Sequence, residues 1–204
     1  MKSIEAYQRL RELHAAAFQT SDAAALLGTT ASHASRTLER LLTAGQVFRL
    51  KRGLWGFPDR LDPLALPQYL TAPLPCYVSL QTALYHHGMI SQIPNIVYAV
   101  SPARTRRWET PVASVSIHHI SPSFFFGFEE PSGKNPTRIA TPEKALIDCF
   151  YLSPARSRLF ARLPELELPI SFNMRRAREF AMRIPSARRQ TIVLQNLSAL
   201  AGSP

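Results

Sequence analysis

Cysteine is scarce in this sequence, and long apolar runs are absent. Cys76 and Cys149 are too few and too isolated for a disulfide framework or a thiolate metal site. No run approaches the roughly 18 apolar residues that span a bilayer, and the first residues alternate charged and apolar side chains where a signal peptide has an apolar core. We therefore expect a soluble, cytoplasmic protein with reduced thiols and no membrane partner.

The motifs of several enzyme classes are also missing. The sequence has no glycine-rich phosphate loop, no HExxH, no GxSxG and no Walker lysine. His118 and His119 fall on a predicted strand and point to opposite faces, whereas His86 and His87 are neighbours on a predicted helix. Neither geometry suits a shared ion, so we predict no metal, no cofactor and no enzymatic activity. His87 is expected to be a hydrogen-bonded core residue.

One carboxylate, Asp148, lies in the apolar part of a helix that is predicted to be buried nearly all round. Lys144 is four residues earlier, and Arg138 or Arg107 could approach in space. Because a buried charge is usually paired, we expect Asp148 to form an ion pair. A catalytic alternative would need Asp148 or His119 to lie exposed in a cleft.

Acidic residues are outnumbered, with 14 Asp and Glu against 24 Lys and Arg and a net charge of +10. The excess lies at the two ends, because the net charge is +4 for residues 1–60, zero for 61–152 and +6 for 153–204. Nucleic acid is the partner that this distribution favours. A basic surface that binds nothing is the alternative.

The first sixty residues contain four patterned segments: a helix over 3–18, a short helix over 20–28, a helix over 29–45 and two strands over 46–57. The first helix carries an apolar stripe that includes Ile4, and the second is expected to begin at a cap formed by Thr20 or Ser21. The "GTT" between the second and third helices is short enough to set them at a steep angle. This succession predicts a winged helix-turn-helix DNA-binding domain over 1–60.

Small polar and basic side chains remain outside once the apolar face of the third helix is buried. Hydroxyls and arginine near a helix N-terminus suit the major groove of double-stranded DNA. A tight turn at 51–53 would place two further cations over the flanking backbone. The predicted DNA-binding residues are Thr30, Ser32, His33, Ser35, Arg36, Arg40, Lys51 and Arg52. A winged helix that binds a protein is the alternative.

Five prolines between residues 58 and 76 predict a linker, with the domain boundary near residue 60. The second domain, 61–204, is predicted to be mixed α/β with C-terminal helices, so the whole chain is α+β. Residues 153–204 form its basic helical extension. The stretch "RTRRWET" (104–110) is expected to connect two strands and to form the basic tip or edge of a hairpin. Its Arg104, Arg106 and Arg107 form either a basic recognition surface or, through Arg107, an ion pair with Glu109 or Asp148.

Local signals predict how other parts of the second domain pack. Ser79 can cap a helix, and Thr141 followed by Pro142 predicts another helix start. The run "FFFGF" at 124–128 is expected to pack in the core and not to stack on bases.

Three segments of the second domain, "YVSLQTALYHHGMI", "RTRRWETPVASVSIHHISPSFFFGFE" and "RIATPEKALIDCFYL", carry a resemblance. In order and spacing they resemble the AbiEi-type antitoxins of type IV, abortive-infection toxin–antitoxin systems. The resemblance runs from about residue 3 to 155 and thins in the C-terminal helices.

The resemblance implies a two-domain antitoxin whose winged helix binds inverted repeats in its own promoter and represses the operon. Its second domain would counteract an AbiEii-like nucleotidyltransferase toxin without a stable complex. DNA binding carries over to Thr30, Ser32, His33, Arg36, Lys51 and Arg52, and antitoxicity carries over only to the domain. The alternative function is a stand-alone regulator whose second domain senses a ligand or a partner.

Overall fold

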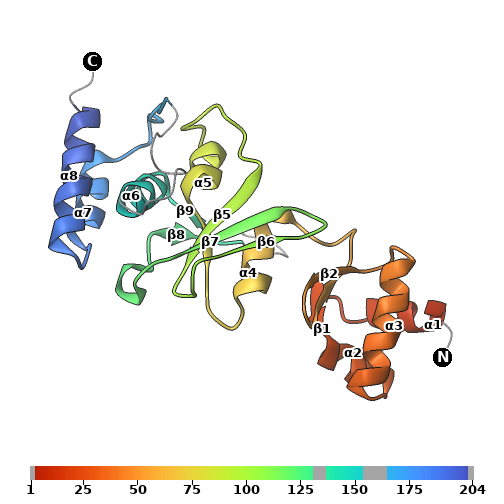
Figure 1. Cartoon of the computed structure of the whole chain (residues 1–204). Coiled ribbons are helices and arrows are strands. Elements are labelled where there is room, and N and C mark those ends of the chain that lie inside the picture. Colours follow the sequence, from red (N-terminus) through yellow and green to blue (C-terminus); the bar gives the residue numbers. More distant parts are fainter. Residues whose placement is uncertain (1–2, 131–136, 154–164, 202–204) are drawn as a thin grey trace.

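The computed structural model describes residues 3–130, 137–153 and 165–201, and it is a mixed structure of helices and two sheets. Its parts follow one another along the molecule (Figure 1). Three helices and a small sheet lie at one end, a six-stranded sheet lies in the middle, and two C-terminal helices lie at the other end. Within the described ranges, no helix is long and apolar enough to cross a membrane.

The N-terminal part contains three helices and a three-stranded antiparallel sheet with the order β1-β3-β2. Its elements are α1 (Ser3–Arg11), β1 (Ala17–Gln19), α2 (Thr20–Leu27), α3 (Ala31–Thr43), β2 (Phe48–Lys51) and β3 (Leu54–Gly56). The helices and the β2–β3 hairpin come in the predicted order, and β1 is an additional strand that the sequence analysis missed. Apolar side chains of all three helices, together with Trp55 and Phe57, form one core.

Two local predictions for this part were wrong. Ile4 is 62% exposed, because α1 buries Ala6 and Leu10 instead. Helix α2 begins at Thr20, after the N-cap residue Gln19, whose backbone N–H donates to Asp22 at 2.7 Å. The Thr20 hydroxyl is used elsewhere, since it accepts a 2.9 Å hydrogen bond from Nε1 of the buried Trp55. Thr20 therefore ties α2 to β3.

The middle part is built on a mixed sheet with the strand order β6-β7-β5-β4-β9-β8. Neighbouring strands are antiparallel except for the pairs β5–β7 and β4–β9. In chain order its elements are a 3₁₀ turn (Pro63–Ala65), α4 (Leu66–Thr71), β4 (Tyr77–Val78), α5 (Leu80–His86), β5 (Ile96–Ser101), β6 (Arg106–Glu109), β7 (Ser114–His119), a second 3₁₀ turn (Pro122–Phe124), β8 (Phe128–Glu129), β9 (Ile139–Ala140) and α6 (Pro142–Leu152).

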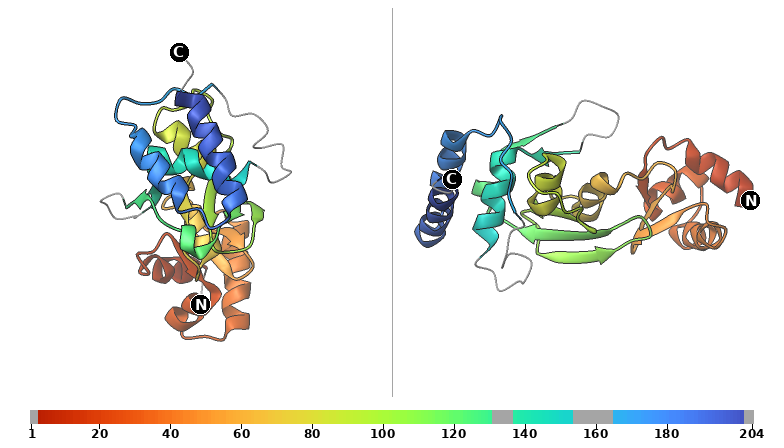
Figure 2. Two further views of the ribbon diagram at one scale, coloured as in Figure 1. Left: turned by 90° about the vertical axis from the view of Figure 1, so that its left-hand side faces the viewer. Right: turned by 90° about the horizontal axis from the view of Figure 1, so that it is seen from above.

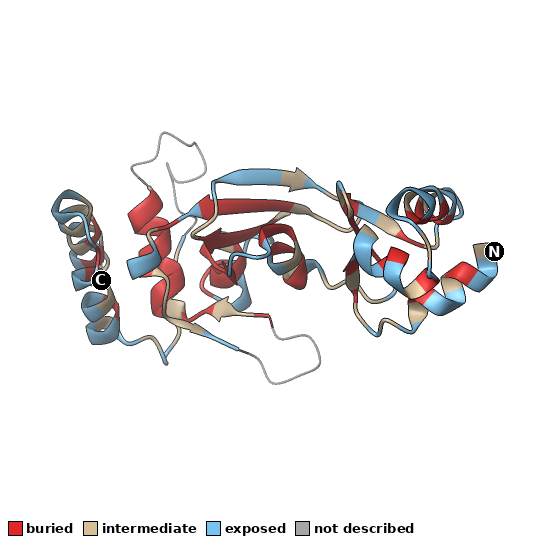
Figure 3. Cartoon of the chain, turned by 90° about the horizontal axis from the view of Figure 1, so that it is seen from below, coloured by how far each residue is buried: buried red, intermediate tan, exposed pale blue. Residues whose placement is uncertain are grey.

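Each face of this sheet packs against different elements. Tyr98 and Val100 of β5 belong to the larger core with α5 and α6. Their neighbours Val97 and Ala99 face the other way, into a cluster that contains residues of α4 and also Leu50 and Leu54 of the β2–β3 hairpin. The proline-rich segment is therefore packed between the hairpin and the sheet. Figure 3 shows buried positions continuing through the sheet and its covering helices.

Two helices, α7 (Met174–Met182) and α8 (Ala187–Ala201), pack against α6 at the far end of the molecule (Figure 2). Glu143 in the first turn of α6 is buried, and its Oε1 accepts from the backbone N–H of Asn173 at 3.0 Å. That contact joins α6 to the start of α7. The predicted C-terminal helices are present, and residues 154–164 of the predicted extension lie outside the described residues.

The aromatic run packs in the core as predicted, and one of the two predicted helix caps is present. Phe124 is fully buried, and Phe125, Phe126 and Phe128 pack against the same core, as expected. Thr141 accepts from the backbone N–H of Lys144 at 3.3 Å and caps α6. Ser79 precedes α5 but its side chain makes no cap hydrogen bond, and its hydroxyl donates to Asp148 at 2.8 Å.

Candidate nucleic-acid interface

Helices α2 and α3 are joined by a turn of three residues whose chemistry fixes both helix ends. Gly28 closes α2 in the left-handed conformation, with φ +61°, which glycine adopts without steric cost. Thr30 is the N-cap of α3, and its hydroxyl accepts from the backbone N–H of His33 at 3.3 Å. Thr30 therefore has a structural role in addition to any contact with a ligand.

The outer face of α3 presents most of the predicted DNA-binding residues to solvent. The helix is strongly amphipathic, because its inner face buries Ala34, Thr37, Leu38 and Leu41. Ser35 is half-buried, and the exposed residues of the predicted set are Thr30, Ser32, His33, Arg36 and Arg40. These side chains form a polar and basic surface over the N-terminal two-thirds of the helix.

The two predicted cations of the β2–β3 hairpin differ in their surroundings. Arg52 is exposed in a two-residue turn with Gly53, whose φ is +77°. Lys51 lies at the end of β2, and its Nζ donates to the Leu70 carbonyl of α4 at 2.8 Å. Burial lowers the pKa of Lys51, and the positive charge of Arg106 lowers it further. Lys51 fastens the hairpin to α4, which the sequence could not indicate, and Arg52 is the free cation of this turn.

Arg49 was not among the predicted residues, although it belongs to the same surface. Its guanidinium pairs with Glu39 of α3 at 3.1 Å and lies 5.1 Å from the centroid of the Trp55 ring. This pair joins α3 to β2 across a half-exposed surface. The alternation of Arg49 with buried Leu50 was the available signal for an outward-facing cation on β2.

The stretch 104–110 is mostly an edge strand of a hairpin, as the predicted tip or edge of a hairpin allowed, and it does not connect two other strands. Residues Arg106–Glu109 form β6, which pairs with β7 on one side only, and residues 110–113 connect the two. Arg104, Arg106 and Arg107 are all exposed. Arg107 pairs with Glu109 at 2.7 Å, one of the two structural alternatives, and Asp148 is not its partner.

Asp148 is fully buried in a polar cluster at the centre of the larger core. It pairs with Lys144 of the same helix, also fully buried, and accepts from the hydroxyls of Tyr77 at 2.9 Å and Ser79 at 2.8 Å. The Lys144 ammonium lies 3.8 Å from the centroid of the Phe124 ring. The predicted ion pair is therefore present, with Lys144 as partner, and neither side chain is exposed to solvent.

The strand pattern predicted the placement of His118 and His119, whereas His87 follows the last residue of α5, His86. His118 is buried and His119 is exposed, on opposite faces of β7, and His119 Nδ1 lies within 3.2 Å of the Pro102 and Ala103 carbonyls. His87 is half-buried, and its Nε2 lies 2.7 Å from the Ala140 carbonyl. In the part of the chain that the structure describes, no cluster of three His, Cys, Asp or Glu could hold a metal ion.

Both thiols are expected to react slowly with thiol reagents in the native protein. Burial raises the pKa of Cys76 from 9.0 to about 11, which lowers its thiolate fraction near pH 8 about 100-fold. Because the folded-state pKa is the higher one, stability should also fall as pH rises from 9.0 through about 11. Disulfide-exchange kinetics with a chromogenic reagent, native against urea-unfolded, measure the first effect. Equal rates in the two states would contradict it.

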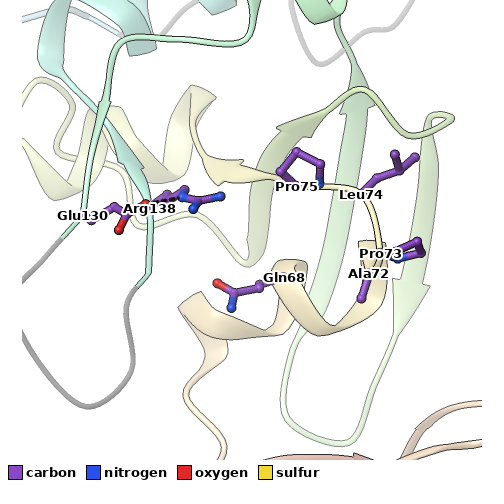
Figure 4. A pocket seen from close by; sticks show the side chains of 7 residues that line it. All are labelled: Gln68, Ala72, Pro73, Leu74, Pro75, Glu130 and Arg138. Atoms are coloured by element: carbon purple, nitrogen blue, oxygen red, sulfur yellow. Dashed lines mark hydrogen bonds and ion pairs between the residues drawn. The ribbon is translucent and has the colours of Figure 1, made fainter.

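Two of the cavities that described residues line lie in the middle part, away from α3. One, of about 250 Å³, is lined by the segment 72–75, Gln68 of α4, and the ion-paired Glu130 and Arg138, whose charges are 2.6 Å apart (Figure 4). The other, of about 540 Å³, is more apolar and has Tyr85, His86 and Ile93 on its wall. Neither includes a predicted DNA-binding residue.

Comparisons with known proteins add little to this geometry. No protein-family model matches the chain, and no curated protein matches it. A solved structure with partial similarity is the solution structure of the antibiotic-resistance factor ANT(2'')-Ia. It has 10% sequence identity over 68% of this chain and 89% of that one, with a TM-score of 0.32. A likeness of this strength supports no conclusion about fold or function.

Proposed function

We propose that this protein is a non-enzymatic, DNA-binding antitoxin that represses its own promoter. The observation that carries the DNA-binding part is the exposed row of Ser32, His33 and Arg36 on α3, which follows α2 after a three-residue turn. Together with the β2–β3 hairpin, these elements have the order of a winged helix-turn-helix, in which the hairpin is the wing. This order and the net charge of +10 favour DNA over a protein partner.

In this proposal α3 enters the major groove with its N-terminal half. Arg36 can donate two hydrogen bonds to a guanine edge, and Ser32 and His33 can reach neighbouring bases. The first-turn amides and Thr30 face phosphate at the positive end of the helix. Arg52 lies over the flanking backbone and contributes affinity without sequence discrimination.

The antitoxin part rests on the resemblance of the second domain to AbiEi-type antitoxins. The partner would be an AbiEii-like nucleotidyltransferase toxin, opposed in the cytoplasm without a stable complex. Burial of Asp148 removes one of the two candidate catalytic groups, which favours a role through binding. His119 is exposed but held at two backbone carbonyls on the sheet surface.

Fluorescence anisotropy with the full chain tests the repressor function. The labelled duplexes are the sequence upstream of its own gene and a scrambled duplex of equal composition, each titrated across a salt series. We expect tighter binding to the upstream duplex and a steep loss with salt, whose slope counts phosphate contacts at about 0.9 each. Equal affinity for both duplexes would refute a promoter-specific repressor.

The 540 Å³ cavity favours a second candidate, a stand-alone regulator whose second domain senses an apolar ligand. Co-expression with the neighbouring nucleotidyltransferase separates the two. Rescue of cell growth by this protein supports the antitoxin, whereas absence of such a gene or of rescue supports the sensor.

A further inference from the structure

The strand β6 brings a further cation, Arg106, to the side of the molecule that carries α3. The view from above (Figure 2, right) shows α3 (orange) and the green strands of the β6–β7 pair on the same side of the molecule. The β6–β7 connection extends toward the N-terminal part (Figure 1). A ligand that lies along α3 and the β2–β3 hairpin would therefore meet β6 next.

Neighbouring arginines of β6 point to opposite faces of the sheet. Arg106 is paired with Ile117, and residues directly opposite in a ladder share a face. Ile117 belongs to the cluster that includes the hairpin residues Leu50 and Leu54, so Arg106 lies on the hairpin side of the sheet. Arg107 is opposite Ser116 and lies on the other side.

The two arginines also differ in their partners. Arg106 forms none of the ion pairs found among residues 3–130, 137–153 and 165–201, and its guanidinium lies 5.0 Å from the centroid of the Trp108 ring. Trp108 packs against the apolar cluster that contains Leu50 and Leu54 of the hairpin. The Trp108 ring therefore offers the Arg106 guanidinium a fixed surface for a cation–π contact. Arg107 is neutralised by Glu109, which also accepts from the hydroxyl of Ser114.

The hairpin packs against the sheet that carries β6, because Leu50 and Leu54 share a cluster with Val115 and Ile117 of β7. Lys51 is anchored to the Leu70 carbonyl, and burial followed by the charge of Arg106 lowers its pKa. The positive charges of Lys51 and Arg106 repel each other, and an anion bound beside them would relieve that repulsion. The exposed Arg52 follows Lys51 directly, so cations continue from the turn to the sheet edge.

We propose that Arg106 is a phosphate contact that extends the DNA interface from the wing onto the sheet of the second domain. This inference rests on the proposed function for its ligand, duplex DNA. It gives the two domains one continuous footprint, with sequence recognition from α3 and sequence-independent backbone contact from β6.

Substitution of Arg106→Gln tests the inference, with Arg107→Gln as a matched control on the same strand and with the same change in charge. Arg106→Gln should weaken binding to the upstream and scrambled duplexes by the same factor, about 3-fold to 10-fold, and reduce the salt slope by about one. Arg107→Gln should leave the slope unchanged. Thermal unfolding of both variants checks that each is folded.

Equal salt slopes for the two variants would overturn the phosphate contact, and so would a loss restricted to the upstream duplex. A loss on duplex RNA with none on DNA would assign Arg106 to another ligand and also overturn it. Failure of the proposed repressor function would give a different result: the unmodified protein would bind the upstream and the scrambled duplex with equal affinity. The contact of Arg106 with phosphate is still measured on the scrambled duplex in that case.

Discussion

Replacement of Asp148 by alanine is expected to lower the free energy of unfolding by about 3–5 kcal/mol. The carboxylate has three partners, Lys144, Tyr77 and Ser79, all fully or almost fully buried. Alanine would leave an uncompensated ammonium and two hydroxyl donors without acceptors, and each lost acceptor adds its own cost. Urea denaturation of the full chain, followed by tryptophan fluorescence, measures the change.

A paired substitution separates the cost of the lone charge from the cost of the cavity. Asp148→Asn keeps an oxygen that can accept from Tyr77 and Ser79 but leaves Lys144 without its counter-charge. Adding Lys144→Met removes that charge while retaining an unbranched chain among the aromatic rings. We expect the double variant to be more stable than Asp148→Asn alone, because a buried ion pair can be replaced by neutral groups of similar volume at little cost.

The Asp148→Asn variant should also gain stability with rising pH. Burial lowers the pKa of Lys144 below 10.5, while Asp148 raises it and so limits that decrease. Without Asp148 the folded-state pKa falls further, and the unfolded chain binds more protons than the folded one between that value and 10.5. Stability must then increase with pH across this window. A constant difference from the unmodified protein between pH 7 and pH 9.5 would contradict a charged, buried Lys144.

The Asp148 cluster illustrates how far local sequence patterns reach. The spacing of Lys144 and Asp148 predicted their pairing because both lie on one helix, four residues apart. Tyr77 and Ser79 could not be assigned to the cluster, since they are about seventy positions away and arrive through the pairing of β4 within the sheet. The order of the helices was predictable for the same reason, because apolar spacing is local. Their ends were less so: the first helix was predicted over 3–18 and ends at Arg11, because residues 17–19 pair with β3 as β1.

Some residues of the candidate nucleic-acid interface could likewise be predicted from the sequence, and others could not. The exposed face of α3 follows from its own periodicity, so Ser32, His33 and Arg36 could be predicted. The anchoring of Lys51 to Leu70 and the placement of Arg106 beside it depend on how the hairpin packs against the second sheet. For a polar or basic residue in a short strand, the neighbouring sequence does not show whether the side chain contacts a ligand or another part of the protein.

Simultaneous replacement of Arg36 and Arg52 by alanine is expected to weaken binding to the upstream duplex about 100-fold or more, while the fold is retained. Both side chains are exposed, and they lie on separate elements, α3 and the β2–β3 turn. Their losses should therefore be close to additive. Arg36 should carry most of the discrimination between upstream and scrambled duplexes, and Arg52 should carry affinity for both. Single variants in the same anisotropy assay test this division.

Arg175→Ala combined with Arg178→Ala is the matched control, because it removes the same charge from exposed positions of α7 at the opposite end of the molecule (Figure 1). Only a small loss is expected from it, since charges beyond about 10 Å are largely screened at ordinary ionic strength. An equal loss in both double variants would mean that binding follows net charge alone.

The proposed protection against a nucleotidyltransferase toxin gives the Arg36→Ala, Arg52→Ala protein a second use. If recognition of DNA belongs to α3 and its hairpin while antitoxicity belongs to the second domain, the Arg36→Ala, Arg52→Ala protein should still rescue growth when the toxin is co-expressed. Expression from a foreign promoter is required, because loss of repression would otherwise raise the amount of antitoxin. A folded variant that loses both activities would show that one surface serves DNA and antitoxicity together, and the continuous face formed by α3, the hairpin and β6 would then be the surface to dissect.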